Sequence, residues 1–98
     1  MQPEDRIREI IESEGILFDR HRLAIMLYLS IKGRARFKEI SEGLGLSPGN
    51  LAHHLKMLEE RNYVRVDKVW RDLRARVVSL TPEGVAALSS LLSRLRRL

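Results

Sequence analysis

The stretch that decides the fold is Leu46–Val64, LSPGNLAHHLKMLEERNYV. Ser47 suits a helix N-cap, and Pro48 suits the first helical position, where an N–H would have no partner in any case. Three leucines then recur at helical spacing and predict one apolar stripe that faces a core: Leu51, Leu55 and Leu58. Because successive helical residues turn by about 100°, Gly49 and His53 project opposite that stripe. The sequence therefore predicts a helix with one buried face and one small or polar face.

A shorter helix is predicted immediately upstream, over Phe37–Leu44, with Gly45 as the residue that ends it. The next helix is expected over residues 47–62, so the connection is very short. Two helices joined by a tight glycine turn form a helix-turn-helix. Before this pair, Arg34–Arg36 is predicted as a short extended segment.

Two more helices are predicted towards the N-terminus. Residues 3–14 begin with Pro and acidic residues, as a helix start should, and Gly15 is expected to break this helix. Asp19–Lys32 carries apolar residues on nearly every side. That pattern predicts a central, largely buried helix.

After Asn62 the apolar period changes from about 3.6 residues to about 2, which predicts strands over Tyr63–Val69 and Ala75–Leu80. The polar segment between them, residues 68–74, is expected to form the tip of a hairpin. The expected fold class is mainly α with a small β-hairpin. Its order is helix, helix, short strand, helix, helix, strand, strand, helix.

The last helix is predicted over residues 82–98, with Thr81 as its cap. The whole chain, 1–98, is long enough for one domain with one core. With 44% hydrophobic residues and no long apolar run, neither a transmembrane helix nor a secretory signal is expected.

The chain has no cysteine, which excludes thiol chemistry, disulfides and cysteine-ligated metal, and which fits a reducing cytoplasm. Fourteen of the 18 basic residues are Arg and thermolabile side chains are few, which points to a thermophilic source. The net charge is +5, and it is unevenly distributed. Residues 1–18 are net acidic and the 47–62 helix is neutral, while the segments on either side of that helix are basic. A polyanion is the natural partner for such a chain.

The stretch LSPGNLAHHLKMLEERNYV resembles the recognition helix of winged-helix regulators of the arsenic-repressor and multiple-antibiotic-resistance types. LTPEG, Leu80–Gly84, is similar to the segment that follows the wing in the same superfamily, and the whole chain looks like its small archaeal-type members. The resemblance implies a winged helix-turn-helix, and a homodimeric transcriptional regulator that binds double-stranded DNA. The 47–62 helix would enter the major groove, and the 68–74 wing would reach the backbone or minor groove.

Carried over by position, five residues of the first motif match DNA-facing positions: Ser47, Gly49, Asn50, His53 and Lys56. The cysteine-containing metal site of arsenic-type sensors is missing, so metal sensing by that route is excluded. No cofactor is implied. Whether a small-molecule effector exists is not indicated.

Basic residues on both sides of the helix are candidates for phosphate contact, which dominates affinity and makes it salt-dependent. They are Arg34, Arg36 and Lys38 before the helix-turn-helix, and Lys68, Arg71, Arg74 and Arg76 in the hairpin. The alternative for the second group is a solvated hairpin; the functional interpretation includes one tip arginine in a narrow minor groove. Trp70 is expected to cover the core beneath the wing.

The histidines do not form a metal pattern. His53 and His54 are adjacent and point about 100° apart, so they lack the spacing of a helical zinc pair. His54 is interpreted as a packed, hydrogen-bonded residue at the side of the helix. With no catalytic carboxylate pair and no phosphate-binding glycine loop, we expect no catalytic residues, no metal and no enzyme activity.

Apolar residues in the first and last helices exceed what the core needs, which favours a two-fold dimer through these helices. They are Ile7, Ile10, Ile11, Leu88, Leu91, Leu92 and Leu95. The alternative is that they fold back on their own domain. Arg94, Arg96 and Arg97 are expected to complement the dipole of the last helix.

The sequence thus favours a dimeric, sequence-specific transcriptional regulator from the cytoplasm of an archaeal or bacterial cell. One alternative is a weakly selective DNA-architectural protein, with a large salt dependence and little operator preference. Another is a winged helix used as a protein-interaction module, which the near-neutral 47–62 helix keeps open. The operator, the regulated genes and the direction of regulation are not indicated.

Overall fold

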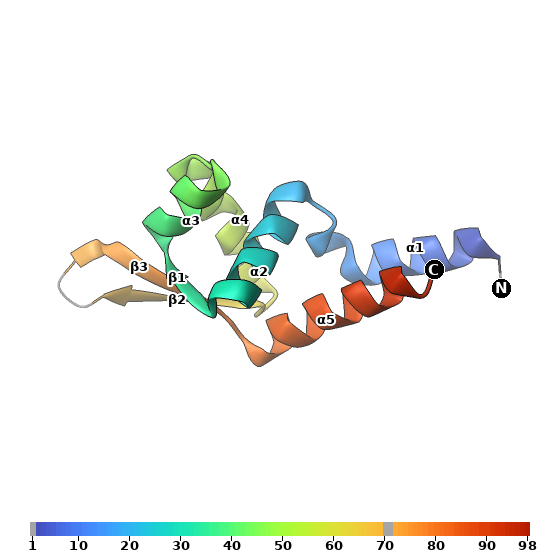
Figure 1. Cartoon of the computed structure of the whole chain (residues 1–98). Coiled ribbons are helices and arrows are strands. Elements are labelled where there is room, and N and C mark those ends of the chain that lie inside the picture. The colour runs from blue at the N-terminus through green and yellow to red at the C-terminus, as the bar shows by residue number, and fades with distance from the viewer. Residues whose placement is uncertain (1, 70–71) are drawn as a thin grey trace.

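The computed structural model describes residues 2–69 and 72–98 (Figure 1). Its elements follow the predicted order: α1 (Pro3–Glu14), the 3₁₀ turn η1 (Gly15–Leu17), α2 (Arg20–Lys32), β1 (Arg34–Arg36), α3 (Phe37–Leu44), α4 (Pro48–Glu60), β2 (Val64–Val69), β3 (Asp72–Leu80) and α5 (Pro82–Arg96). The mainly helical class with a small antiparallel sheet is confirmed. The expectations for Trp70, Arg71 and the side chain of Arg74 lie outside what the structure describes.

The helix-turn-helix forms as its end signals predict. The Ser47 hydroxyl accepts a hydrogen bond from the Asn50 N–H at the start of α4. Gly45 ends α3 with φ 64°, a left-handed conformation that glycine adopts without steric cost. The turn is closed by the Leu46 N–H, which donates to the Ser41 carbonyl at 2.9 Å. These local contacts fix the angle at which α4 leaves α3.

The sheet has the order β1-β3-β2, with both pairs antiparallel. Arg34 and Arg36 on β1 lie opposite Ser79 and Val77, so the short strand predicted before the helix-turn-helix joins the base of the hairpin. The long pair β2–β3 projects from the body as the wing, at the left of Figure 1.

The predicted bounds of the wing tip, residues 68–74, were wrong. Lys68 pairs with Arg76 and Val69 with Asp72, past an irregularity after Lys68, so β3 begins three residues before the predicted Ala75. Asp72, Leu73 and Arg74 continue the alternation of polar and apolar residues of this strand, but the charged residues of the segment favoured a polar turn. The sequence pattern therefore extends as far as the ladder, and the interpretation ended the strand too early.

The leucine stripe of α4 is buried as predicted, with Leu51, Leu55 and Leu58 at most 3% exposed. The same core includes the middle of α2 (Ile25, Met26 and Leu29) and, from the sheet, Ala35, Val64 and Val78. The prediction for the rest of α2 was wrong in part, because Leu27 is 37% and Ile31 83% exposed. Neighbouring elements cover the middle of this helix but leave one side of its C-terminal half open.

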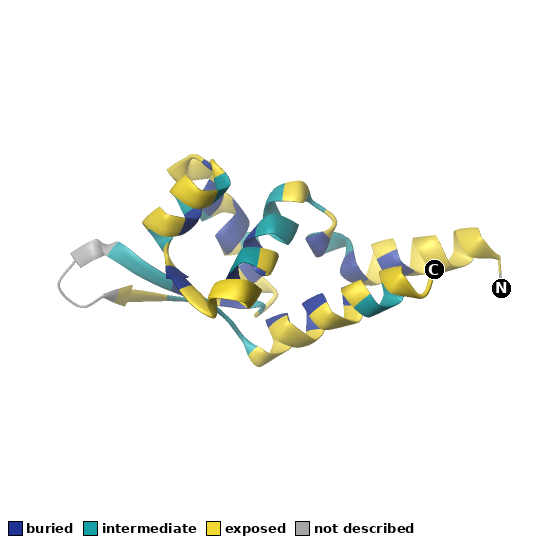
Figure 2. Cartoon of the chain, viewed as in Figure 1, coloured by how far each residue is buried: buried dark blue, intermediate teal, exposed yellow. Residues whose placement is uncertain are grey.

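Helices α1 and α5 lie side by side and extend away from the body, on the side opposite the wing (Figure 1). We call this pair the arm, and α2, α3, α4 and the sheet the head. Ile10 of α1 and Leu88 and Leu91 of α5 are buried, whereas Figure 2 shows the N-terminal part of α1 exposed. Arg94 does more than complement the helix dipole, because it donates to the Ser13 hydroxyl of α1 at 2.7 Å.

The head and the arm meet at a tight junction between Asn62–Tyr63 and the start of α5. Thr81 donates its backbone N–H to the Tyr63 carbonyl and its hydroxyl to the Asn62 carbonyl, and it caps α5 by accepting from the Gly84 N–H. A Cβ at Gly84 would lie 2.0 Å from the Tyr63 carbonyl oxygen. Only glycine permits this approach, which explains the Gly in the LTPEG segment.

Candidate nucleic-acid interface

The face of α4 opposite the buried leucines is open to solvent. Its sequence-predicted DNA-facing residues are all exposed: Ser47, Gly49, Asn50, His53 and Lys56. No other part of the structure lies within 4 Å of a Cβ built at Gly49. The first turns of α4 therefore present a small, uncharged surface to which another molecule can come close.

Exposed basic residues precede α3, on and just after β1. Arg34 and Arg36 are exposed on β1, which ends where α3 begins. The Arg36 N–H donates to Glu39, and Lys38 lies 3.9 Å from Glu42, an ion pair on a well-exposed surface. Surface pairs of that kind are weak, so Lys38 can exchange this partner for a phosphate at little cost.

The wing carries further basic residues at its described positions. Lys68 is exposed on β2. Arg76 is partly covered because its guanidinium lies 5.5 Å from the centre of the Phe37 ring, within cation–π range. Arg65 is paired with Asp67 at 2.9 Å, which neutralises it locally. The ring of Phe37 thus ties the wing to the start of α3, next to the β1 arginines.

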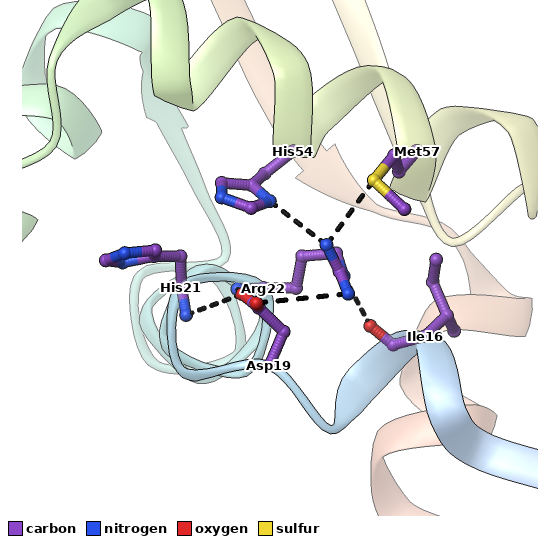
Figure 3. Close-up of polar contacts among 6 residues, drawn as sticks. All are labelled: Ile16, Asp19, His21, Arg22, His54 and Met57. Atoms are coloured by element: carbon purple, nitrogen blue, oxygen red, sulfur yellow. Dashed lines mark hydrogen bonds and ion pairs between the residues drawn. The ribbon is translucent and has the colours of Figure 1, made fainter.

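Beneath the exposed face of α4 lies a polar cluster that the sequence did not reveal (Figure 3). The guanidinium of Arg22 donates through Nε to the Ile16 carbonyl at 2.6 Å. Its Nη1 lies 3.2 Å from His54 Nδ1 and 3.3 Å from Met57 Sδ, both on α4. Asp19, the N-cap of α2, lies 4.0 Å from Nη2. We call these five residues the Arg22 cluster.

The Arg22 cluster joins three elements, because Ile16 belongs to η1, Arg22 to α2, and His54 and Met57 to α4. His54 is only 8% exposed, which confirms its interpretation as a packed, hydrogen-bonded residue. Its partner, however, is an arginine 32 positions earlier in the chain. Sequence spacing carries no signal for such a contact; only the N-cap pattern at Asp19 marks the neighbourhood.

Burial lowers the pKa of His54 below its ordinary value, and the positive charge of Arg22 acts in the same direction against an opposing contribution from Asp19. For Asp19, burial alone would raise the pKa. It is nevertheless lowered, because the N–H groups of Arg22 and His21 donate to the carboxylate and Arg22 is positively charged. His54 is therefore neutral and Asp19 ionised near neutral pH.

Over residues 2–69 and 72–98, no group of three His, Asp or Glu side chains has metal-binding geometry. None of the helices described there is both long and apolar enough to cross a membrane.

The residues predicted for a dimer interface fall into two groups. Ile10, Leu88 and Leu91 are at most 5% exposed and belong to the protomer's own core. The other four, together with Leu98, keep 37% to 59% of their surface exposed: Ile7, Ile11, Leu92 and Leu95. Folding back on the protomer thus accounts for the first group and leaves the second uncovered.

A helix-turn-helix followed by a β-hairpin wing, with an exposed polar face on the second helix, defines the winged-helix class. The chain belongs to the winged helix DNA-binding domain family, whose model matches residues 21–98. That match covers the head and all of α5. The family's description is of DNA binding and not of an enzyme, and two of its structural neighbours are described as transcriptional regulators.

Solved structures agree with this assignment. A transcriptional regulator homologue from Pyrococcus horikoshii is 35% identical over 95% of this chain and 92% of that chain, with a TM-score of 0.87. A MarR-family regulator from Silicibacter pomeroyi is 22% identical over 95% and 61%, with a TM-score of 0.72. Reduced AbfR bound to DNA is 19% identical over 95% and 64%, with a TM-score of 0.79. No similarity to a curated protein sequence was found.

The Pyrococcus regulator confirms the sequence-based resemblance to a small archaeal-type member. The chain spans less than two thirds of the Silicibacter regulator and of AbfR, and their low identities support the fold alone.

Proposed function

We propose that this protein is a homodimeric transcriptional regulator that binds a pseudo-palindromic DNA site. The observation that carries the proposal is the division of α4 into two faces. One face is buried through three leucines, and the other presents Ser47, Gly49, Asn50, His53 and Lys56 to solvent. A helix anchored in this way can insert its exposed first turns into a major groove without disturbing the core.

The side chains divide into those that would recognise bases and those that would bind the backbone. Asn50 and His53 are the candidates for base edges, since an amide can pair with adenine and an imidazole can donate or accept. Phosphate contacts are assigned to the cations around the helix, which are Arg34, Arg36, Lys38, Lys56, Lys68, Arg71, Arg74 and Arg76. The DNA-bound AbfR structure, which shares the fold, supports a duplex partner.

The dimer is proposed to form through the arm. Ile7 and Ile11 lie one helical turn apart on α1, and Leu92 and Leu95 are neighbours on α5, so each helix presents an exposed apolar strip. Residues 1–18 are net acidic and the end of α5 is basic, which favours α1 of one copy against α5 of the other. A two-fold dimer would place two α4 helices about one DNA turn apart.

The proposal also includes a cytoplasmic location and an archaeal or thermophilic source. The archaeal relative and the arginine-rich composition support the source. Cofactor dependence is not part of the proposal.

The test is selection of duplexes from a random pool at two salt concentrations. We expect a two-fold-symmetric site, for which Asn50→Ala and His53→Ala each lose about tenfold in affinity, because each contact to a base edge contributes roughly 1–3 kcal/mol. Arg36→Ala should weaken binding to all sequences alike and reduce the salt slope by about 1. Ser90→Ala, an exposed position on α5 outside the proposed interface, is the control.

Two other outcomes would overturn the proposal in favour of its alternatives. Tight, salt-sensitive binding without enrichment of any sequence would identify a DNA-architectural protein. Absence of binding at low salt would exclude both DNA functions and indicate a protein partner for the exposed face of α4.

A further inference from the structure

The Arg22 cluster is a polar connection between the segment that follows α1 of the arm and the exposed helix α4 of the head. Arg22 has only 14% of its side chain exposed, yet it contacts a carbonyl of η1 on one side and two side chains of α4 on the other. η1 continues directly from α1. Figure 3 shows the guanidinium between the Ile16 carbonyl and the pair His54 and Met57.

This geometry requires a particular protonation state of His54. A guanidinium has donors and no acceptor, so Nδ1 of His54 must accept the hydrogen bond, and the ring must be neutral with its proton on Nε2. Protonation would place an N–H against the N–H of Arg22 and set two positive charges 3.2 Å apart. The contact between α2 and α4 can then no longer form.

We propose that Arg22 and His54 are positioning residues for DNA recognition by α4, and that protonation of His54 releases α4 and weakens sequence-specific binding. The inference rests on the proposed function, since it assigns a regulation to that same interface. His54 is buried and lies one residue after the exposed His53, so it acts through the orientation of α4 and does not touch DNA itself.

The charged and titratable groups around His54 determine whether its protonation stabilises or destabilises the contact between α2 and α4. From α2 and its cap, it faces the cation Arg22, the anion Asp19 and the ring of His21, whose centroid lies 5.3 Å away. On α4 itself, the ring of His53 lies at 5.2 Å. η1 contributes an uncharged carbonyl. A proton on His54 therefore adds positive charge next to Arg22, which cannot lose its own.

Simple electrostatics predicts the opposite result for DNA. Positive charge added to a protein by acid neutralises more phosphate charge, and it should strengthen binding to any duplex as the pH falls. If α4 is released, binding to the selected site should weaken relative to other sequences under the same conditions. The ratio of the two affinities therefore separates the two effects.

The experiment measures that ratio with two duplexes, the selected site and a scrambled duplex of the same length and composition, from neutral pH down to the lowest pH at which the natural chain stays folded. For the natural chain we expect the ratio to fall roughly tenfold as His54 becomes protonated. His54→Asn should hold the ratio constant at acid pH, because an amide oxygen accepts from Arg22 and does not titrate. His53 is present in both chains, so its contribution to binding is common to the two and cancels from the comparison.

Arginine variants test the positioning role independently of pH. Arg22→Ala should lower the affinity ratio at every pH by roughly tenfold. Arg20→Ala, which removes the same charge two residues away at an exposed position, should leave the ratio unchanged. Arg22→Lys should resemble Arg22→Ala, because an ammonium cannot reach three separated acceptors.

Hydrogen exchange of the free protein distinguishes failure of this inference from failure of DNA binding. Protection of the Leu51–Leu58 amides, relative to those of α3, should fall on acidification of the natural chain and not of His54→Asn. If protection of α4 is unaffected by pH, or if the two chains share one pH profile of the affinity ratio, the inference is wrong. Failure of the selection while α4 still loosens in acid would overturn the DNA function and leave the switch in place.

Discussion

Helix α4 of the head and the two helices of the arm differ in how completely the protomer buries their apolar side chains. In α4 the three leucines of the stripe are at most 3% exposed, and what remains outside is small, polar or basic. In the arm, Ile7, Ile11 and Leu95 keep more than a third of their surface exposed. Helix α4 is thus buried on one face and polar on the other, whereas the arm keeps an exposed apolar strip, which we propose forms half of an interface.

The largest effect is expected where the two regions join. Gly84→Ala would place a Cβ 2.0 Å from the Tyr63 carbonyl oxygen, a backbone atom that cannot move without displacing β2 or α5. We expect a loss of at least about 3 kcal/mol, enough to unfold much of the protein. Thermal unfolding followed by circular dichroism measures it, with Gly15→Ala as the control, since no contact lies within 4 Å there. A variant as stable as the natural protein would show that the junction is not needed to hold head and arm together.

Within the head, Leu58→Ala should lower the free energy of unfolding by about 3 kcal/mol, because the side chain is fully buried and leaves a cavity. Denaturant titration measures this value. If the head is complete without a partner, the loss is the same at every protein concentration. A loss that varied with concentration would break the comparison, since the core of the head would then depend on association.

Within the arm, Ile11→Asp should affect association more than folding. The side chain is 48% exposed in the protomer, so a carboxylate is tolerated there, but not in an apolar interface. We expect the dimer dissociation constant to rise about a hundredfold in sedimentation experiments. Ile31→Asp is the matched control, an isoleucine of the head that is 83% exposed. Should Ile31→Asp dissociate the dimer instead, the interface lies on α2.

Acid should destabilise the head through two groups. The folded pKa of His54 is lowered, so below its ordinary value of 6.5 the unfolded chain takes up a proton that the folded chain does not, and stability falls. The folded pKa of Asp19 is lowered from 3.8, so its contribution is present above that value and is lost as the pH falls through the folded pKa. Denaturant midpoints across this pH range measure both. In His54→Asn the first decrease should disappear and the second remain.

The substitution Gly49→Ala is expected to have the smallest effect on stability, and its effect on DNA binding should have the opposite sign. Gly49→Ala adds a methyl group in open space on a helix, so we expect stability to rise by a few tenths of a kcal/mol. The same methyl group lies on the face proposed to approach DNA, and affinity for the selected duplex should fall. A simultaneous gain in both quantities would show that DNA does not come close to Gly49.

Much of the head could be predicted because its signals are local. Ser47 and Gly45 mark helix ends through contacts within a few residues, and the leucine spacing identified the buried face of α4. The DNA-facing residues were assigned through the resemblance, and the structure shows only that they are exposed.

Contacts between residues far apart in the sequence carried no such local signal. The Arg22–His54 bond spans 32 positions, and the exposure of Ile31 depends on which neighbours cover α2. The extension of β3 to Asp72 was missed because the charged residues of this segment were interpreted as a polar turn, although they continue the alternation of the strand.

The junction at Gly84 has a consequence for the spacing of DNA half-sites. It fastens the chain just beyond the C-terminal end of α4 to α5, while Arg22 fastens the middle of α4 to the segment that follows α1. Each helix of the arm is therefore attached to α4 by its own polar contact. In a dimer joined through the arms, the crossing angle of the two helix pairs would determine how far apart the two α4 helices stand. The number of base pairs between half-sites would then be encoded at the arm, in residues that never approach DNA.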